Sequence, residues 1–266
     1  MEFFEAIILG AVQGVAEWIP ISSEGVTLLV ATKLFEGSIT IKEMITISLY
    51  LHLGTFLAAL IYFKKDIWYL IKQLFQYKKA NEKTKNLINF YIIATLVSGL
   101  LGLLILGGIT ELEGAIAFSQ GAILITLGIL LLLTGLLQIW HKHEGKRVST
   151  DINITDGIIT GVAQGLAVIP GFSRSGFTVS ALLLRGIKDT DALKLSFILS
   201  LPIVLIGNII LDTSPFIFTL GSLMGLTLSF VFGLLTIHGL LKLSQKFQFG
   251  WFVIFFGVLV IGSVLI

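Results

Sequence analysis

Two stretches of this chain, 151 positions apart, align without a gap and share their glycines and hydroxyl residues. Gly10–Thr27 reads GAVQGVAEWIPISSEGVT, and Gly161–Thr178 reads GVAQGLAVIPGFSRSGFT. The copies differ in charge, because the first carries Glu17 and the second carries Arg174. Self-similarity at a fixed spacing is the signature of a structural repeat. We therefore expect two related polar hairpins, one acidic and one basic.

The segments around each copy are apolar but short. They cover residues 2–17 and 24–35 in the first copy and 153–168 and 174–186 in the second. Each is shorter than the roughly 20 residues that a spanning helix needs. Proline and glycine break the chain between them, and Ser173 is a good N-cap for the helix that follows. The pattern predicts re-entrant helical hairpins with polar tips.

The composition places these hairpins in a membrane protein. The chain is 55% hydrophobic and 13% charged, and its mean hydropathy is +0.98. Soluble domains carry about twice that charged fraction. A net charge of +2 gives no reason to expect nucleic acid, and the absence of cysteine excludes disulfides and thiolate chemistry. We expect an all-α polytopic membrane protein with a single membrane domain, residues 1–266.

Six further apolar segments are long enough to span a bilayer. They cover residues 39–63, 86–108, 118–140, 189–211, 216–241 and 248–266. Three spans per half is an odd number, so the second copy is expected to be inverted relative to the first. The prediction is an inverted-topology repeat, with repeat one at about 1–140 and repeat two at about 153–266. Each half would contain a re-entrant hairpin and three transmembrane helices.

The loop charges predict the orientation of the spans. Lysines concentrate in residues 64–85 and basic residues in 141–147, whereas 109–117 carries only acidic charge. The positive-inside rule then puts the first two loops in the cytoplasm of a multi-pass plasma-membrane protein. The hairpins would enter from opposite sides and meet near mid-membrane. Residues 66–77 are expected to form an interfacial amphipathic helix.

The two tips together carry the residues of a phosphate site. A buried arginine is costly in a membrane and usually marks function, and Arg174 is flanked by hydroxyls that suit phosphate. Glu17 could bind a divalent cation or act as a base, and Ser23 or Ser22 could be the nucleophile. These are the parts of a phosphoryl-transfer site. Its depth implies a substrate with a lipid tail.

These motifs resemble the undecaprenyl-diphosphate phosphatase family of the bacitracin-resistance type. The resemblance rests on Gln13-x-x-x-Glu17, on Pro20-Ile21-Ser22-Ser23 and on Pro170-Gly171-Phe172-Ser173-Arg174-Ser175. It implies a hydrolase that converts polyprenyl diphosphate to the monophosphate and phosphate with Mg²⁺ or Ca²⁺. It also implies recycling of the lipid carrier for cell-envelope glycan synthesis, and a possible homodimer. Carried over by position, the catalytic residues are Glu17, Ser23 and Arg174. The substrate-binding residues are Gln13, Ser22, Ser173, Ser175 and Thr178, and Glu17 is the metal ligand.

One position departs from the family pattern. Many members have a histidine where this chain has Val26, and Glu24 is also unusual at its position. The serine must therefore be activated by another group, and we favour Glu17 with its cation. His52, the one histidine in the middle of a predicted span, is the alternative. The departure also leaves open an archaeal-type polyprenol as the lipid.

Other interpretations remain for the same residues. A transporter or flippase of an anionic polyprenyl lipid would also use inverted repeats with broken helices at mid-membrane. Arg174 could be a structural bridge to Glu17, and His52 a satisfied buried histidine. The glycines of both copies have the small-xxx-small spacing of helix packing. Gln13 and its counterpart Gln164 could bind only loop carbonyls.

Overall fold

The computed structural model describes residues 3–19, 22–35, 41–113, 145–169, 173–210, 219–244 and 249–262, with scattered positions between 125 and 139. In these residues the chain is helical, with one isolated β-bridge. The short helices are α1 (Phe3–Ala16), α2 (Ser23–Leu34), α4 (Lys64–Phe75), α7 (Ile154–Leu166) and α8 (Arg174–Leu184). The long helices are α3 (Ile41–Tyr62), α5 (Glu82–Glu113), α9 (Asp189–Ile210) and α10 (Leu220–Leu243), and α11 runs over Phe249–Gly262.

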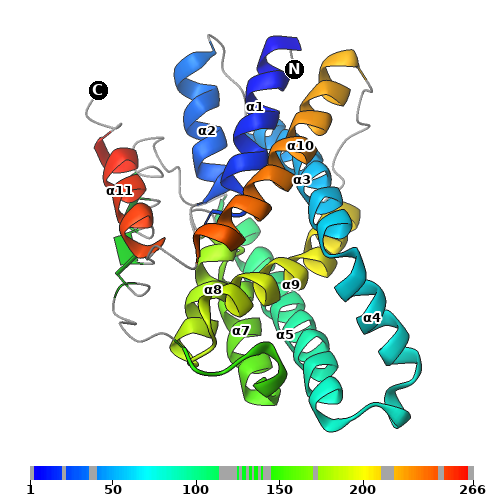
Figure 1. Cartoon of the computed structure of the whole chain (residues 1–266). Coiled ribbons are helices and arrows are strands. Elements are labelled where there is room, and N and C mark those ends of the chain that lie inside the picture. The colour runs from blue at the N-terminus through cyan, green and yellow to red at the C-terminus, as the bar shows by residue number, and fades with distance from the viewer. Residues whose placement is uncertain are drawn as a thin grey trace.

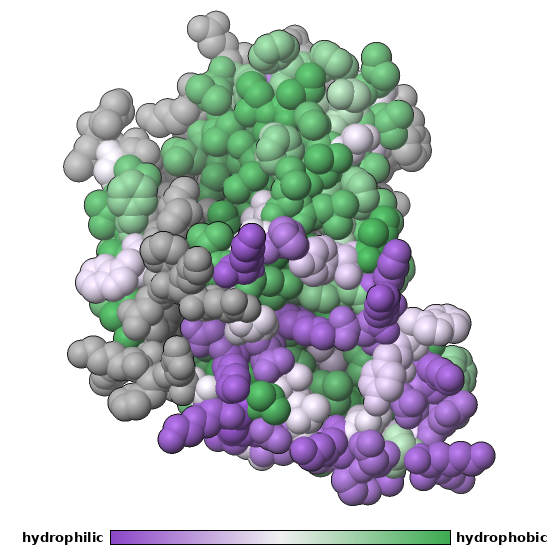
Figure 2. Space-filling view, in the orientation of Figure 1, coloured by the Kyte–Doolittle hydropathy of each residue, from purple (hydrophilic) through white to green (hydrophobic). Residues whose placement is uncertain are grey.

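The long helices confirm a polytopic membrane protein. Three of them, over Glu82–Gly108, Asp189–Ile209 and Leu220–Leu243, are long and apolar enough to cross a bilayer. A fourth span is possible if α3 and α4, which meet at a 77° bend, are taken together. On the face shown in Figure 2, apolar side chains gather in the upper part and polar ones toward the lower end. The predicted span at 118–140 lies mostly outside the described residues.

The two predicted hairpins are present as pairs of short helices. In both, a serine caps the second helix: Ser22 Oγ accepts from the Gly25 N–H at 3.2 Å, and Ser173 Oγ accepts from the Gly176 N–H at 3.0 Å. Such caps satisfy backbone donors that have no partner inside the helix. The repeated sequence thus produces the same local structure twice. In Figure 1, α1 and α2 lie in the upper half and α7 and α8 in the lower half.

Each hairpin packs against a long helix from the other half of the sequence. Helix α1 lies along α10, and α7 lies along α5. A Cβ built on Gly10 would lie 2.2 Å from the Gly225 carbonyl oxygen, and one on Gly161 would lie 2.9 Å from that of Ala94. The aligned glycines therefore allow close helix contact in both halves. This confirms the packing role expected from their spacing.

Large buried side chains fix the first hairpin tip against α9. Trp18 and Phe197 are buried and stack edge to face with ring centroids 4.9 Å apart. Phe63 at the end of α3 and Phe90 on α5 belong to the same cluster. Since Trp18 follows Glu17 directly, this packing holds the first tip in place.

Helix α4 begins where α3 ends and turns away from it. None of its residues is buried, and Trp68 and Phe75 are 69% and 86% exposed. Its apolar residues recur at helical spacing, and its lysines lie in its first and last turns. A helix is thus confirmed at the predicted interfacial segment, over Lys64–Phe75.

Candidate active site

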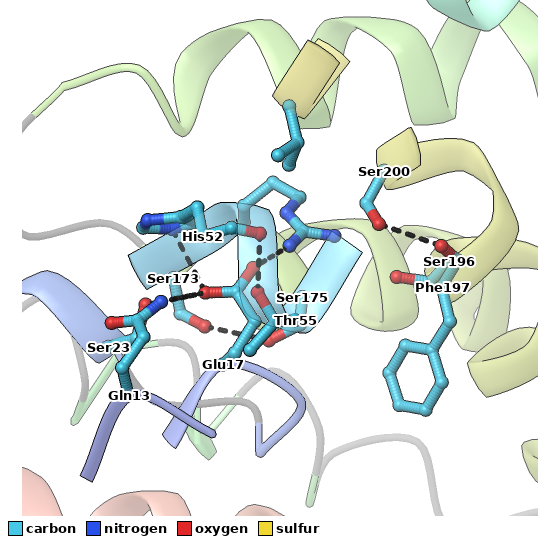
Figure 3. Close-up of polar contacts among 12 residues, drawn as sticks. Gln13, Glu17, Ser23, His52, Thr55, Ser173, Ser175, Ser196, Phe197 and Ser200 are labelled. Carbon is cyan, nitrogen blue, oxygen red and sulfur yellow. Dashed lines mark hydrogen bonds and ion pairs between the residues drawn. The ribbon is translucent and has the colours of Figure 1, made fainter. Parts of the chain in front are cut away.

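The carboxylate of Glu17 lies at the centre of the candidate site, just after the end of α1. Its side chain is 3% exposed, and one oxygen, Oε1, is paired with Arg174 Nη2 from the other hairpin. The second oxygen, Oε2, accepts from Gln13 Nε2 at 2.9 Å and from Ser23 Oγ at 2.9 Å, and lies 3.0 Å from His52 Nε2 (Figure 3). One carboxylate therefore joins both hairpin tips to the long helix α3.

Arg174 is the first residue of α8, where the free N–H groups of the helix start favour negative charge. Its guanidinium carbon lies 5.9 Å from the centre of the Trp18 ring, and its side chain is 17% exposed. Among the described residues its Nη1 is buried without a hydrogen-bond partner. A buried donor of this kind is costly unless something accepts from it. Arg174 thus holds Glu17 through Nη2, and its second donor, Nη1, has no acceptor among the described residues.

A pocket lies between the two tips. It is lined by Glu17, Ser22, Ser23, Glu24, His52, Ala167, Ser173, Arg174 and Ser175. The empty space among them, including its open mouth, is about 330 Å³. That space is too small for a long polyprenyl chain, so the tail of such a lipid would lie outside the pocket.

Three of the predicted substrate-binding serines reach this pocket. Ser22 and Ser173 are the N-caps described above, and Ser173 Oγ also lies 3.2 Å from Ser175 Oγ. Ser175 Oγ donates to the Ile19 carbonyl at 3.0 Å, which ties the second tip to the first. The hydroxyls therefore serve both to build the tips and to line the pocket.

The other two predicted substrate-binding residues do not line the pocket. Thr178 is fully buried, and its hydroxyl bonds the Arg174 carbonyl at 2.8 Å and Ser196 Oγ on α9. Gln13 is also fully buried, and its side-chain amide donates to the Glu17 carboxylate. Its repetition in both copies had suggested a hydrogen bond to a loop carbonyl instead. Its counterpart Gln164 donates to Ser98 Oγ at 3.0 Å.

His52 was expected from the sequence only as an alternative base, and the structure brings it to this site. It lies in the middle of α3, 35 positions after Glu17, and its neighbours LYLHLGT are largely apolar. His52 is a largely buried histidine with a partner for each ring nitrogen, as one interpretation expected, and the partner of its Nε2 is the Glu17 carboxylate. The available signal was its depth in a span, where ionisable residues are rare and functional.

The donor set also bears on the predicted divalent cation. Both carboxylate oxygens of Glu17 already have partners, and two of these partners, Arg174 and His52, are basic groups. In the described part of the chain no group of three His, Cys, Asp or Glu residues is arranged to hold a metal. Glu24 is exposed and lines the pocket, and Mg²⁺ is commonly held by one carboxylate together with substrate phosphates. Of the two carboxylates, Glu24 is therefore the one with oxygens free of basic partners within the described ranges, and it would hold a cation together with phosphate oxygens.

Comparison with known proteins gives matches over almost the whole chain. A family model described as "Bacitracin resistance protein BacA" matches residues 6–262. An undecaprenyl-diphosphatase of Methanococcoides burtonii is 41% identical over 259 residues, which is 96% of each chain. The undecaprenyl-diphosphatase of Haloarcula marismortui is 38% identical, over 98% of this chain and 97% of its own length. The undecaprenyl-diphosphatase of Methanothrix thermoacetophila is 35% identical, also over 98% of this chain and 97% of its own length.

Proposed function

This chain belongs to the bacitracin resistance protein BacA family, and we propose that it is an integral membrane phosphatase that hydrolyses undecaprenyl or a related polyprenyl diphosphate. The products are the polyprenyl monophosphate and phosphate, so the lipid carrier is recycled for cell-envelope glycan synthesis. The observation that carries the proposal is the Glu17 carboxylate, which joins Ser23 of one tip to Arg174 of the other.

In the first step Ser23 Oγ attacks the terminal phosphorus of the diphosphate. Its hydrogen already points at Glu17 Oε2, 2.9 Å away, so Glu17 takes the proton as the Oγ–P bond forms. The bond from phosphorus to the bridging oxygen breaks, and that oxygen leaves with its electron pair as part of the polyprenyl monophosphate. Water then attacks the phosphorus of the phosphoserine and the Oγ–P bond breaks. The proton held by Glu17 returns to Ser23 Oγ, and both protons of the water leave with the phosphate as H2PO4−.

Arg174 supplies positive charge where the transition state needs it. Protonation of Glu17 removes the counter-ion of the guanidinium, which then faces the phosphate oxygens with its free Nη1 as well. Donors fixed in advance in a site of low polarity stabilise developing charge without reorganisation. Ser173 and Ser175 would hold further phosphate oxygens at the start of α8.

The divalent cation, Mg²⁺ or Ca²⁺, stays part of the proposal. Glu24 would hold it together with diphosphate oxygens, and when bound it would neutralise charge on the substrate. Glu17, which we expected to be the ligand, is assigned the role of base.

We also propose the finer architecture predicted above, an inverted-topology repeat in the plasma membrane. The equivalent glycines of α1 and α7 each pack on a long helix of the opposite half, α1 on α10 and α7 on α5. This reciprocal packing supports two repeats related by an axis in the membrane plane. The loop charges support a cytoplasmic position for residues 64–85. A homodimer remains a proposal from the family resemblance.

The competing function is a carrier or flippase of an anionic polyprenyl lipid, which the opposed hairpins would also suit. The experiment is phosphate release from farnesyl or undecaprenyl diphosphate by purified protein in detergent micelles, with and without a chelator. A micelle has no two sides, so transport cannot contribute. We expect release that stops on chelation and resumes on adding Mg²⁺ or Ca²⁺. Binding of the lipid without any release would favour the carrier.

A further inference from the structure

We propose that His52 is a positioning residue of this site, which holds the Glu17 carboxylate on Ser23 from the long helix α3. The inference rests on the proposed phosphatase function. Val26 has no group that takes or gives a proton, whereas His52 Nε2 lies 3.0 Å from Glu17 Oε2 and its side chain is 14% exposed. The ring also lines the pocket between the tips.

The partners of His52 indicate a positively charged ring. Its Nδ1 lies 2.6 Å from the Ser48 carbonyl oxygen one helical turn earlier, closer than the Ser48 hydroxyl at 3.4 Å. A carbonyl and a carboxylate only accept hydrogen bonds, so both ring nitrogens must donate. An imidazole with hydrogens on both nitrogens is a cation. The contact with Ser48 also fixes the direction of the ring from within α3.

His52 thereby changes the charge around Glu17. One carboxylate lies between two cations, Arg174 and His52, so these three groups carry a net charge of +1. Such a cluster attracts an anionic diphosphate. Glu24, which also lines the pocket, offsets this positive charge until a cation binds to it. Without His52 the pair of Glu17 and Arg174 would be neutral.

His52 also keeps Glu17 from turning toward Arg174. A carboxylate and a guanidinium prefer two parallel hydrogen bonds. Arg174 Nη1 has no partner among the described residues, so a second bond to it is open to Oε2. The hold of His52 on Oε2 opposes that rotation and leaves the oxygen 2.9 Å from Ser23 Oγ. The base thus stays on the nucleophile, and Nη1 stays available for phosphate.

The test compares His52→Leu and His52→Gln with the parent protein in phosphate release from farnesyl diphosphate. His238→Gln is the matched control, because His238 pairs with Tyr62 on the exposed surface, outside the site. Loss of a hydrogen bond to a charged group predicts a kcat for His52→Leu lower by on the order of 10- to 100-fold. His52→Gln keeps an N–H donor without the charge and should fall between.

A double-mutant cycle with Glu17→Gln separates positioning from a merely structural role. If His52 acts through Glu17, His52→Leu has little further effect on the residual kcat of Glu17→Gln. An equal loss in both backgrounds, or a kcat unchanged in His52→Leu, overturns the inference. If His52→Leu does not fold, the same comparison is made with His52→Gln. Absence of phosphate release by the parent protein would instead contradict the proposed phosphatase function.

Discussion

Replacing Arg174 with lysine should remove most of the activity while leaving the fold intact. Lysine restores the charge beside Glu17 but is a single point donor, whereas the guanidinium pairs with Glu17 through Nη2 and keeps Nη1 free. The substitution also removes the cation–π contact with Trp18. We expect similar protein yield and thermal stability, and a much lower kcat/KM.

The size of the loss follows from the two contacts. A hydrogen bond from a charged donor to phosphate contributes about 1.5–3 kcal/mol, and a partly buried cation–π contact about 0.5–1 kcal/mol. Together they predict a loss of about 2–4 kcal/mol in transition-state stabilisation, or roughly 30- to 1000-fold in kcat/KM. Arg174→Ala should in addition destabilise the fold, because it leaves a buried carboxylate with one basic partner fewer.

The assay is steady-state phosphate release from farnesyl diphosphate by purified protein, with the melting temperature of each variant measured in the same detergent. Arg174→Lys at near-parental kcat/KM would refute the reasoning and make Arg174 a structural bridge.

Three further predictions concern packing, topology and the cation. Gly161→Ala should lower the melting temperature, because the added Cβ would lie 2.9 Å from the Ala94 carbonyl oxygen. Gly99→Ala on α5 is the control, because a Cβ there would meet open space; equal melting temperatures for the two variants would contradict the packing of α7 on α5. Cysteines introduced at Lys79 and Glu113 should be labelled from opposite sides of the membrane, and labelling from one side would exclude the inverted repeat. Glu24→Gln should raise the Mg²⁺ concentration needed for half-maximal activity, and an unchanged value would place the cation elsewhere.

The local structure of the hairpins could be read from the sequence because it depends on neighbouring residues. Ser22 and Ser173 precede glycine-containing helix starts at equivalent positions, and both became N-caps. The ion pair between Glu17 and Arg174 was also foreseeable, since each is a costly charge at the tip of a hairpin and each needs a partner.

Contacts between distant helices could not be read in the same way. Nothing near His52 in the sequence indicates that α3 brings it to Glu17, and its apolar neighbours suggest ordinary burial. Thr178, in contrast, was predicted at the site and does not line it. It lies one helical turn from Arg174, but its hydroxyl bonds Ser196 on α9. Only the packing of α8 against α9 decides which way that hydroxyl points.

The measurement that tests the central claim most directly is phosphate release by the Ser23→Ala variant. Ser23 is the proposed nucleophile, and its Oγ lies 2.9 Å from Oε2 of the proposed base Glu17. The purified parent protein should hydrolyse polyprenyl diphosphate, and Ser23→Ala, with an unchanged melting temperature, should be slower by on the order of 1000-fold or more. A folded Ser23→Ala variant that releases phosphate at close to the parental rate would contradict the account.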